Sequence, residues 1–176
     1  MQPLRRLPLA AVAALALAAR APGAHADGNP IQLSLFTPIQ VVQADQSVSG
    51  LRLDLIYGRN ANVTGVDWGL VNHDTGSGKA WQLGAVNVVG ENFTGWQDGY
   101  VNLTHGRFAG LQSGGFNRSE SMTGFAYGLV NVTMDMHGLQ LGLVNVTDTM
   151  HGLQIGVGNV ITKGKVPFLP IVNWSF

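Results

Sequence analysis

Two histidines occupy equivalent places in the chain and have a side chain suited to metal binding. His137 and His151 are fourteen residues apart, and Asp135 and Asp148 lie close to them in the sequence. Imidazole and carboxylate groups are common zinc ligands, so these residues could form a weak metal site. No third ligand recurs at the same spacing, which favours histidines in solvent-facing turns. We therefore expect no metal and no cofactor.

Carboxylates are the other residues that could do chemistry. Asp54, Asp67 and Asp98 lie in segments with a strand pattern, and a pair of them could act as acid and base. They occupy different positions of the repeat described below, so no converging pair is predicted. The chain has no cysteine, no Gly-x-Ser-x-Gly, no phosphate loop and no Ser/His/Asp arrangement. We predict a protein that is not an enzyme and has no catalytic residues.

Composition and length place the chain in a narrow class. Its 176 residues suit one domain, and 45% apolar with 11% charged residues is typical of a stacked or membrane-facing architecture rather than an ordinary soluble one. Setting aside Arg5, Arg6 and Arg20 leaves seven Lys and Arg against ten Asp and Glu. Because this balance provides no polybasic face, we expect no nucleic-acid partner.

The first 26 residues have the pattern of a secretory signal peptide. Arg5 and Arg6 form a positive start, residues 7–19 a short apolar run, and Ala24-His25-Ala26 a small-residue cleavage site. The run is too short to span a bilayer as a helix. The predicted mature protein is a single β-repeat domain over residues 27–176.

A repeat fills this domain and must position every residue named above. Three rows of fourteen from Gly124 read GFAYGLVNVTMDMH, GLQLGLVNVTDTMH and GLQIGVGNVITKGK. The template is Gly-φ-x-φ-Gly-φ-φ-Asn, where φ is apolar, followed by six or seven polar-leaning residues. Nine units, 14 or 15 residues apart, end near residues 57, 72, 87, 102, 117, 131, 145, 159 and 173. After Tyr57 in the first unit, the anchors are Asn72, Asn87, Asn102, Asn117, Asn131, Asn145, Asn159 and Asn173.

Each unit alternates with the period of a β-strand. Leu139, Leu141 and Leu143 share one face, while Gln140 and the residues that alternate with it share the other. We expect the Leu face to form a dry core with an apolar column at Phe93, Phe108, Met122, Met136 and Met150. Recurrent glycine inside the strands suggests packing against bare backbone. The Leu face also carries Trp68, Trp81, Trp96, Tyr100, Phe125 and Tyr127, as core or lipid-facing residues, with sugar stacking the weaker alternative.

Two all-β architectures fit the repeat. In a β-solenoid, Gly138 and Asn145 mark two corners, equivalent residues stack about 4.8 Å apart, and the anchor asparagines hydrogen-bond in a structural ladder. This interpretation also explains most of the Asn-x-Ser/Thr sequons without glycans. The alternative is a ten-stranded antiparallel outer-membrane β-barrel, favoured by the alternation of Val172, Trp174 and Phe176 at the end of the chain. A barrel has a natural period of two strands, whereas all units here are alike, so the solenoid is preferred.

A resemblance accompanies these patterns. The units GLQLGLVN and GLQIGVGN, the opening PIQLSLFTPIQ and the ending PFLPIVNWSF resemble a bacterial family of exported surface-repeat proteins with tandem GLQIGLVN-like units. The resemblance covers essentially the whole mature chain, which departs from the pattern at Asp98, Ser113 and Gly158. It implies a location at the outer membrane, the cell surface or in the periplasm, and it brings no catalytic residues.

The expected function follows from the repeat, the signal peptide and the resemblance. We expect a non-enzymatic structural or interaction protein of the bacterial cell envelope or surface, with an unidentified envelope or surface partner. The alternative is a small outer-membrane barrel with a pore or transport role.

Overall fold

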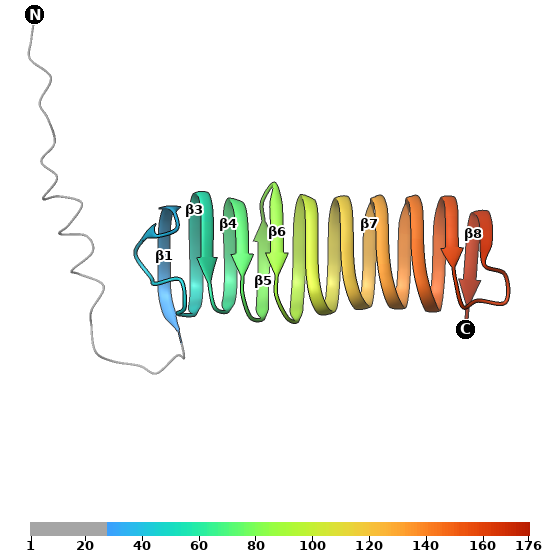
Figure 1. The fold of residues 1–176 in the computed structure, drawn as a ribbon, viewed down its shortest axis with the longest axis horizontal. Coiled ribbons are helices and arrows are strands. Elements are labelled where there is room, and N and C mark those ends of the chain that lie inside the picture. The colour runs from blue at the N-terminus through green and yellow to red at the C-terminus, as the bar shows by residue number, and fades with distance from the viewer. Residues whose placement is uncertain (1–27) are drawn as a thin grey trace, which may run out of the picture.

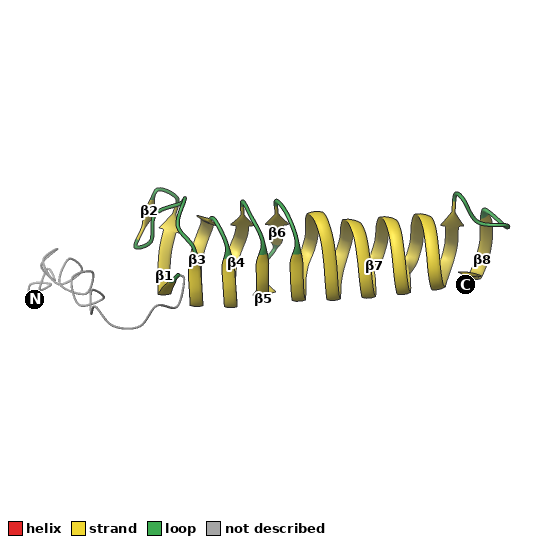
Figure 2. Cartoon of the chain, turned by 90° about the horizontal axis from the view of Figure 1, so that it is seen from below, coloured by secondary structure: helices red, strands yellow, loops and turns green. Residues whose placement is uncertain are grey.

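The protein is a single stack of β-coils (Figures 1 and 2). The computed structural model describes residues 28–176, and the predicted signal peptide lies outside them. Among the described residues, no helix is long and apolar enough to cross a membrane. The strands are β1 (Asn29–Phe36), β2 (Ile39–Gln40), β3 (Val48–Asn60), β4 (Val63–Asp74), β5 (Gly78–Leu83), β6 (Val86–Val89), β7 (Phe93–Ile161) and β8 (Phe168–Ser175).

Successive coils pair in parallel, one repeat unit above the next. Gly50 is aligned with Gly65, Gly65 with Ala80, and Ala80 with Gly95. Later units continue the same spiral as the single long strand β7, coiled around the axis in Figure 1. The parallel register confirms the predicted all-β solenoid of 14–15-residue units, and it excludes the antiparallel arrangement of the alternative.

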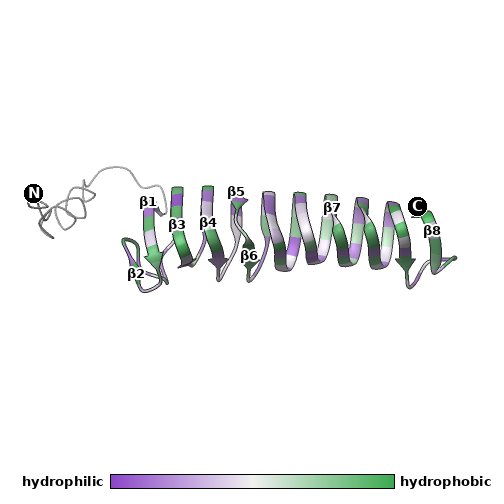
Figure 3. Ribbon diagram, turned by 90° about the horizontal axis from the view of Figure 1, so that it is seen from above, coloured by the Kyte–Doolittle hydropathy of each residue, from purple (hydrophilic) through white to green (hydrophobic). Residues whose placement is uncertain are grey.

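The inside and the outside of the coil are the reverse of the sequence-based expectation. Gln140 and Asn145 are completely buried, whereas Leu143 is 54% exposed and neither Leu139 nor Leu141 is buried. The expectation of a Leu core is therefore wrong, because the exposed fractions place the Leu face outside. Figure 3 shows hydrophobic and hydrophilic residues interspersed along the coils. The predicted burial of the apolar column is confirmed: its five side chains are all buried, namely Phe93, Phe108, Met122, Met136 and Met150.

Glycine explains why the strand face that carries Gln140 is the inner one. Gly142 shares that face, and a Cβ added there would lie 2.7 Å from Nδ2 of Asn131 and 3.0 Å from Oδ1 of Asn145. The inner face thus needs bare backbone for the Asn amides to pack against. Leucines alternate with these glycines, so they must point outward.

The leading glycine of each unit is needed for a different reason. Gly138 has a φ of 136°, and a Cβ added to it would lie 2.0 Å from the carbonyl oxygen of Gly124 in the preceding coil. This backbone conformation strains any residue that has a side chain.

We predict that Gly138→Ala destabilises the fold by roughly 2 kcal/mol or more, because it combines a disfavoured φ with a backbone clash. Gly158→Ala is the matched control, since the nearest atom to its added Cβ is 3.8 Å away on the Phe168 ring. The control should change stability by less than about 0.5 kcal/mol. Urea denaturation of both variants provides the measurement, and equal losses would contradict this role for the leading glycine.

Both ends of the stack depart from the repeat. In the first unit the register shifts between Asp54 and Tyr57, so that Gly58 rather than Tyr57 lies opposite Asn72. At the other end β8 runs antiparallel to β7 and pairs Asn173 with Gln154. Pro170 in β8 lacks a backbone N–H, and proline on an edge strand discourages the addition of another strand. The last unit is therefore a reversed cap rather than a further parallel coil.

Candidate functional site

A ladder of asparagine amides runs along the interior. From Asn72 to Asn145, each Nδ2 donates a 2.8 Å hydrogen bond to Oδ1 of the anchor in the next coil, and Asn159 accepts the last of these bonds. At the first end, Oδ1 of Asn72 has no donor, because Gly58 occupies the equivalent place in the preceding coil. Asn173 does not continue the ladder; its Nδ2 donates to the backbone oxygen of Asn159 instead. The seven ladder members are Asn72, Asn87, Asn102, Asn117, Asn131, Asn145 and Asn159.

A second polar column, made of glutamines, also lies in the interior and was not anticipated from the sequence. Gln97 Nε2 donates to Gln82 Oε1 at 2.7 Å, and Gln112 Nε2 donates to Gln97 Oε1 at 2.9 Å. Gln154 and Gln140 form the same contact at 2.8 Å. Ala126 interrupts this column between Gln112 and Gln140, and Oε1 of Gln154 has no donor. The axial bonds between neighbouring amides lower the burial penalty of the polar interior.

At the N-terminal end this glutamine column becomes ionic. Arg52 and Asp67 occupy its first two places, and the guanidinium contacts both oxygens of Asp67 at 2.6 Å. Arg52 also lies 3.1 Å from Asp54 and 2.6 Å from Asp74, and all four side chains are fully buried. The sequence-based expectation that these carboxylates do not converge is therefore wrong for Asp54 and Asp67, while Asp98 lies elsewhere. We call Arg52, Asp54, Asp67 and Asp74 the charged cluster.

Three carboxylates around one guanidinium leave the charged cluster with excess negative charge. Burial raises the pKa of Asp54 from 3.8 to about 6, although Arg52 opposes the shift. Burial also raises the pKa of Asp74, again against the effect of Arg52. Burial alone would lower the pKa of Arg52, but Asp74, Asp67 and Asp54 raise it above its ordinary value. The cluster therefore holds protons more tightly in the folded state than in the unfolded chain.

We predict that the N-terminal coils lose stability as pH rises. Below the unfolded pKa of Asp54 the stabilisation is fully present, and it is lost as pH rises through the folded value of about 6. The free energy of opening of β3 and β4 should fall by on the order of 2 kcal/mol across this range. The free energy of opening is measured by hydrogen exchange of the β3 and β4 amides at each pH, after correction for the pH dependence of the intrinsic exchange rates. Asp54→Asn should make the profile shallower rather than flat, because Asp74 keeps its raised pKa. A stability that instead rises with pH would contradict the prediction.

The two histidines of the possible metal site do lie side by side. Their ring centroids are 5.8 Å apart, and His137 Nε2 is 3.5 Å from Asp135 on the exposed corner. Asp148 instead faces Lys163 at 3.7 Å. Within residues 28–176, no group of three or more His, Asp or Glu side chains is gathered closely enough to hold a metal ion.

The outer surface of the stack is apolar along one side. The parallel strand register aligns residues of successive coils in columns. One column contains Leu51, Val66, Trp81 and Trp96, and the next contains Leu53, Trp68 and Leu83. No member is buried, and Trp68 and Tyr127 are 63% and 54% exposed. We call this surface the outer apolar face; it comprises Leu51, Leu53, Val66, Trp68, Trp81, Leu83, Trp96, Leu111, Phe125, Tyr127, Leu139, Leu141, Leu153 and Ile155.

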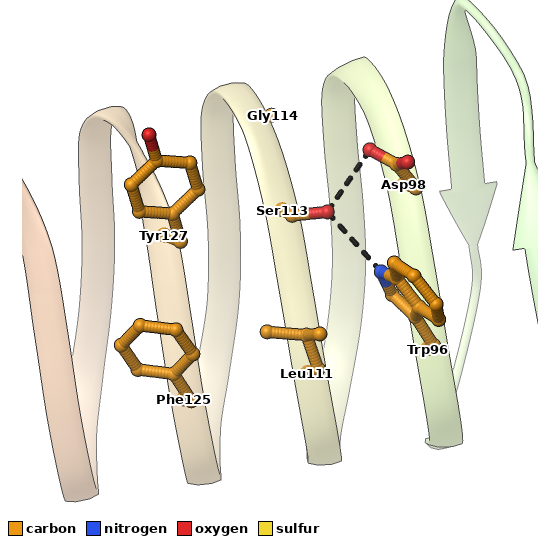
Figure 4. Close-up of a pocket in the computed structure, with 7 residues that line it drawn as sticks. All are labelled: Trp96, Asp98, Leu111, Ser113, Gly114, Phe125 and Tyr127. Atoms are coloured by element: carbon orange, nitrogen blue, oxygen red, sulfur yellow. Dashed lines mark hydrogen bonds between the residues drawn. The ribbon is translucent and has the colours of Figure 1, made fainter.

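A polar notch interrupts the outer apolar face in the middle of the stack (Figure 4). Ser113 Oγ lies 2.9 Å from Asp98 Oδ1 and donates to it, and it accepts a 3.1 Å hydrogen bond from Trp96 Nε1. Trp96 also stacks on Trp81, with centroids 5.3 Å apart and planes 16° from parallel. The surface here is hollowed by about 440 Å³ between Trp96 and the rings of Phe125 and Tyr127.

Comparison with protein-family models, curated proteins and solved structures gives no match for this chain. The features of the molecule that bear on function are a polar, hydrogen-bonded interior and an outer apolar face with one notch. The six aromatics of the Leu face were located correctly on one side of the strands, but they lie outside rather than in a core. The charged cluster had a sequence signal, because Arg52 and Asp67 hold the same place in successive units.

Proposed function

We propose that the protein is a non-enzymatic interaction scaffold of the bacterial cell envelope, which presents the outer apolar face to a partner. The observation that carries this proposal is the size and continuity of that face. Large exposed apolar surfaces on folded proteins mark interaction sites, because leaving them in water is unfavourable. Here the surface includes at least one residue from every coil between β3 and the end of β7.

The interior supports a scaffold role over a catalytic one. The carboxylates of the charged cluster that could act as acid and base are fully buried, so a substrate could not reach them in the folded protein. Asn and Gln ladders tie each coil to its neighbours, which makes a stiff and straight support. A stiff support holds the outer side chains at fixed spacing, which favours binding by lowering the entropy lost on association.

The envelope location rests on the sequence. The N-terminal pattern of residues 1–26 is that of a secretory signal, and the tandem units resemble exported surface-repeat proteins. Export would bring the outer apolar face into contact with envelope components.

Fractionation of cells that produce the protein tests this function. The wild-type chain should lose its first residues and be recovered with the envelope, partly in chemically cross-linked complexes. Trp68→Ser with Tyr127→Ser removes two exposed rings of the outer apolar face and should shift the protein to the soluble envelope fraction. Met134→Ser with Val166→Ser is the matched control, because both residues are exposed but lie off that face. Cytoplasmic recovery, or equal behaviour of the two double variants, would contradict the proposal.

A further inference from the structure

The notch is the one place where the outer apolar face loses its apolar pattern in two successive coils. Its slot holds Leu53, Trp68 and Leu83 before the notch, and Tyr127, Leu141 and Ile155 after it. Asp98 and Ser113 occupy the slot between them. A carboxylate in such a surface is not required by the fold, since apolar residues fill the equivalent place elsewhere.

Asp98 has no ionic partner in the protein. Among residues 28–176, no Lys, Arg or His side chain forms an ion pair with it. Ser113 hydrogen-bonds to Oδ1, and no described residue donates a hydrogen bond to Oδ2. An unpaired negative charge on an apolar surface attracts a cation.

Aromatic residues line the two hollows that adjoin this carboxylate. Asp98 lines the hollow of about 440 Å³ and also a neighbouring one of about 540 Å³. Trp81 stacks on one side of Trp96. Leu111 lies on the other side, followed by Phe125 and Tyr127 in the next coil (Figure 4). The ring planes of Phe125 and Tyr127 are 25° from parallel. The aromatic residues that line the two hollows are Trp68, Trp96, Tyr100, Phe125 and Tyr127.

We propose that the notch binds a quaternary ammonium group, with the positive charge facing Asp98 and the methyl groups against Trp96, Phe125 and Tyr127. Ring faces attract cations, and aromatic residues with a carboxylate complement a methylated ammonium in both charge and shape. A primary ammonium is less suitable, because it is strongly hydrated and needs three acceptors, whereas a quaternary one needs none. This ligand assignment rests on the proposed interaction role of the outer apolar face and names the chemistry it would recognise.

The site is arranged before a ligand arrives. The hydrogen bond from Trp96 Nε1 to Ser113 and the stacking on Trp81 both hold the indole in place. Ser113 in turn orients the carboxylate. A preformed site loses less entropy on binding than a mobile one.

Calorimetric titration of the purified protein tests the proposal. The probes are choline and 3,3-dimethyl-1-butanol, which has nearly the same shape without the charge. Choline should bind at least about tenfold more tightly than the neutral alcohol. Asp98→Asn should weaken choline binding by a similar factor and leave the alcohol unaffected. Trp96→Leu should weaken both, and Asp148→Asn, which changes an exposed carboxylate elsewhere, should weaken neither.

The quaternary ammonium group occurs both free and as a lipid headgroup, so a second arm separates these sources. Vesicles of phosphatidylcholine and of phosphatidylglycerol are sedimented with the protein. Binding to phosphatidylcholine but not to phosphatidylglycerol, lost in Asp98→Asn, supports the site and indicates a lipid headgroup as its ligand. Binding of choline without binding to vesicles supports the site and indicates a soluble ligand. Equal binding of choline and the alcohol, an unaltered Asp98→Asn variant, or no choline binding would each overturn the proposal. Envelope association of the wild-type chain would survive that result, so the two proposals fail separately.

Discussion

Replacing Arg52 with methionine should destabilise the N-terminal coils more than any other single change proposed for this protein. Arg52 is the single cation among three buried carboxylates and lies 2.6 Å from both Asp67 and Asp74. Methionine keeps the length of the side chain but leaves the carboxylates uncompensated, and breaking a buried ion pair from one side costs about 3 to 5 kcal/mol. Urea denaturation should show this loss of stability, and hydrogen exchange of the β3 and β4 amides should locate it in the N-terminal coils.

Two further variants distinguish charge from packing. Arg59→Met removes an exposed guanidinium from the same strand and should have little effect. A fully neutral cluster, with methionine at 52 and asparagine at 54, 67 and 74, should recover much of the stability, because neutral replacement of a buried ionic group is often tolerated. If Arg52→Met and Arg59→Met are equally stable, the charged cluster contributes nothing to the fold.

Asn145→Ala should be the most damaging change in the middle of the stack. The substitution removes the 2.8 Å bonds between Asn145 and both Asn131 and Asn159, and the 2.9 Å bond to the oxygen of Ile155. Each net bond contributes roughly 0.5 to 1.5 kcal/mol, and a buried partner left unpaired costs about 1 to 3 kcal/mol. A total loss of a few kcal/mol is expected by equilibrium denaturation.

A side chain of similar size at position 145 should not restore the stability of the fold. Asn145→Leu has a similar size but cannot pair, so it should be as harmful as alanine or more so. Asn92→Ala is the matched control: Asn92 is exposed on the polar corner, where water can replace its 3.0 Å bond to the N–H of Arg107. A shift below about 0.5 kcal/mol for Asn145→Ala would remove the ladder from the list of stabilising features.

The period of the repeat was sufficient to predict the architecture. Equal units with Gly124, Gly138 and Gly152 in one column require each unit to have the same environment, which parallel stacking provides. The buried column of Phe93 through Met150 could be predicted as well, because large apolar residues at a turn have no use in water. These features depend only on local alternation and on spacing.

The direction of the two strand faces could not be predicted from hydrophobicity. The usual rule places Leu139 inside and Gln140 outside, but it assumes that a buried amide has no partner. In a stack of identical units each amide meets its own copy one coil away, so Gln140 and Asn145 can be buried at low cost. The better signal was Gly142, which shares the face of Gln140 and packs closely against the amides of Asn131 and Asn145.

The strand pairing at the two ends of the stack could not be predicted from the repeat either. The register shift at Asp54 and the reversal at β8 occur where one neighbouring unit is missing, so the template no longer decides the pairing. The charged cluster combines two positions of the repeat unit: Arg52 and Asp67 share the place of the glutamines, whereas Asp74 lies two residues after an anchor.

The orientation of the coil is the central claim, and two adjacent residues test it most directly. The chain has no cysteine, so Ala126→Cys and Tyr127→Cys each introduce a single thiol. Ala126 is 1% exposed in the Gln column and Tyr127 is 54% exposed on the outer apolar face. A water-soluble maleimide should label Cys at 127 rapidly in the native protein, and Cys at 126 only after denaturation. Rapid labelling at 126 with protection at 127 would mean that the Leu face is the core and would contradict this structure.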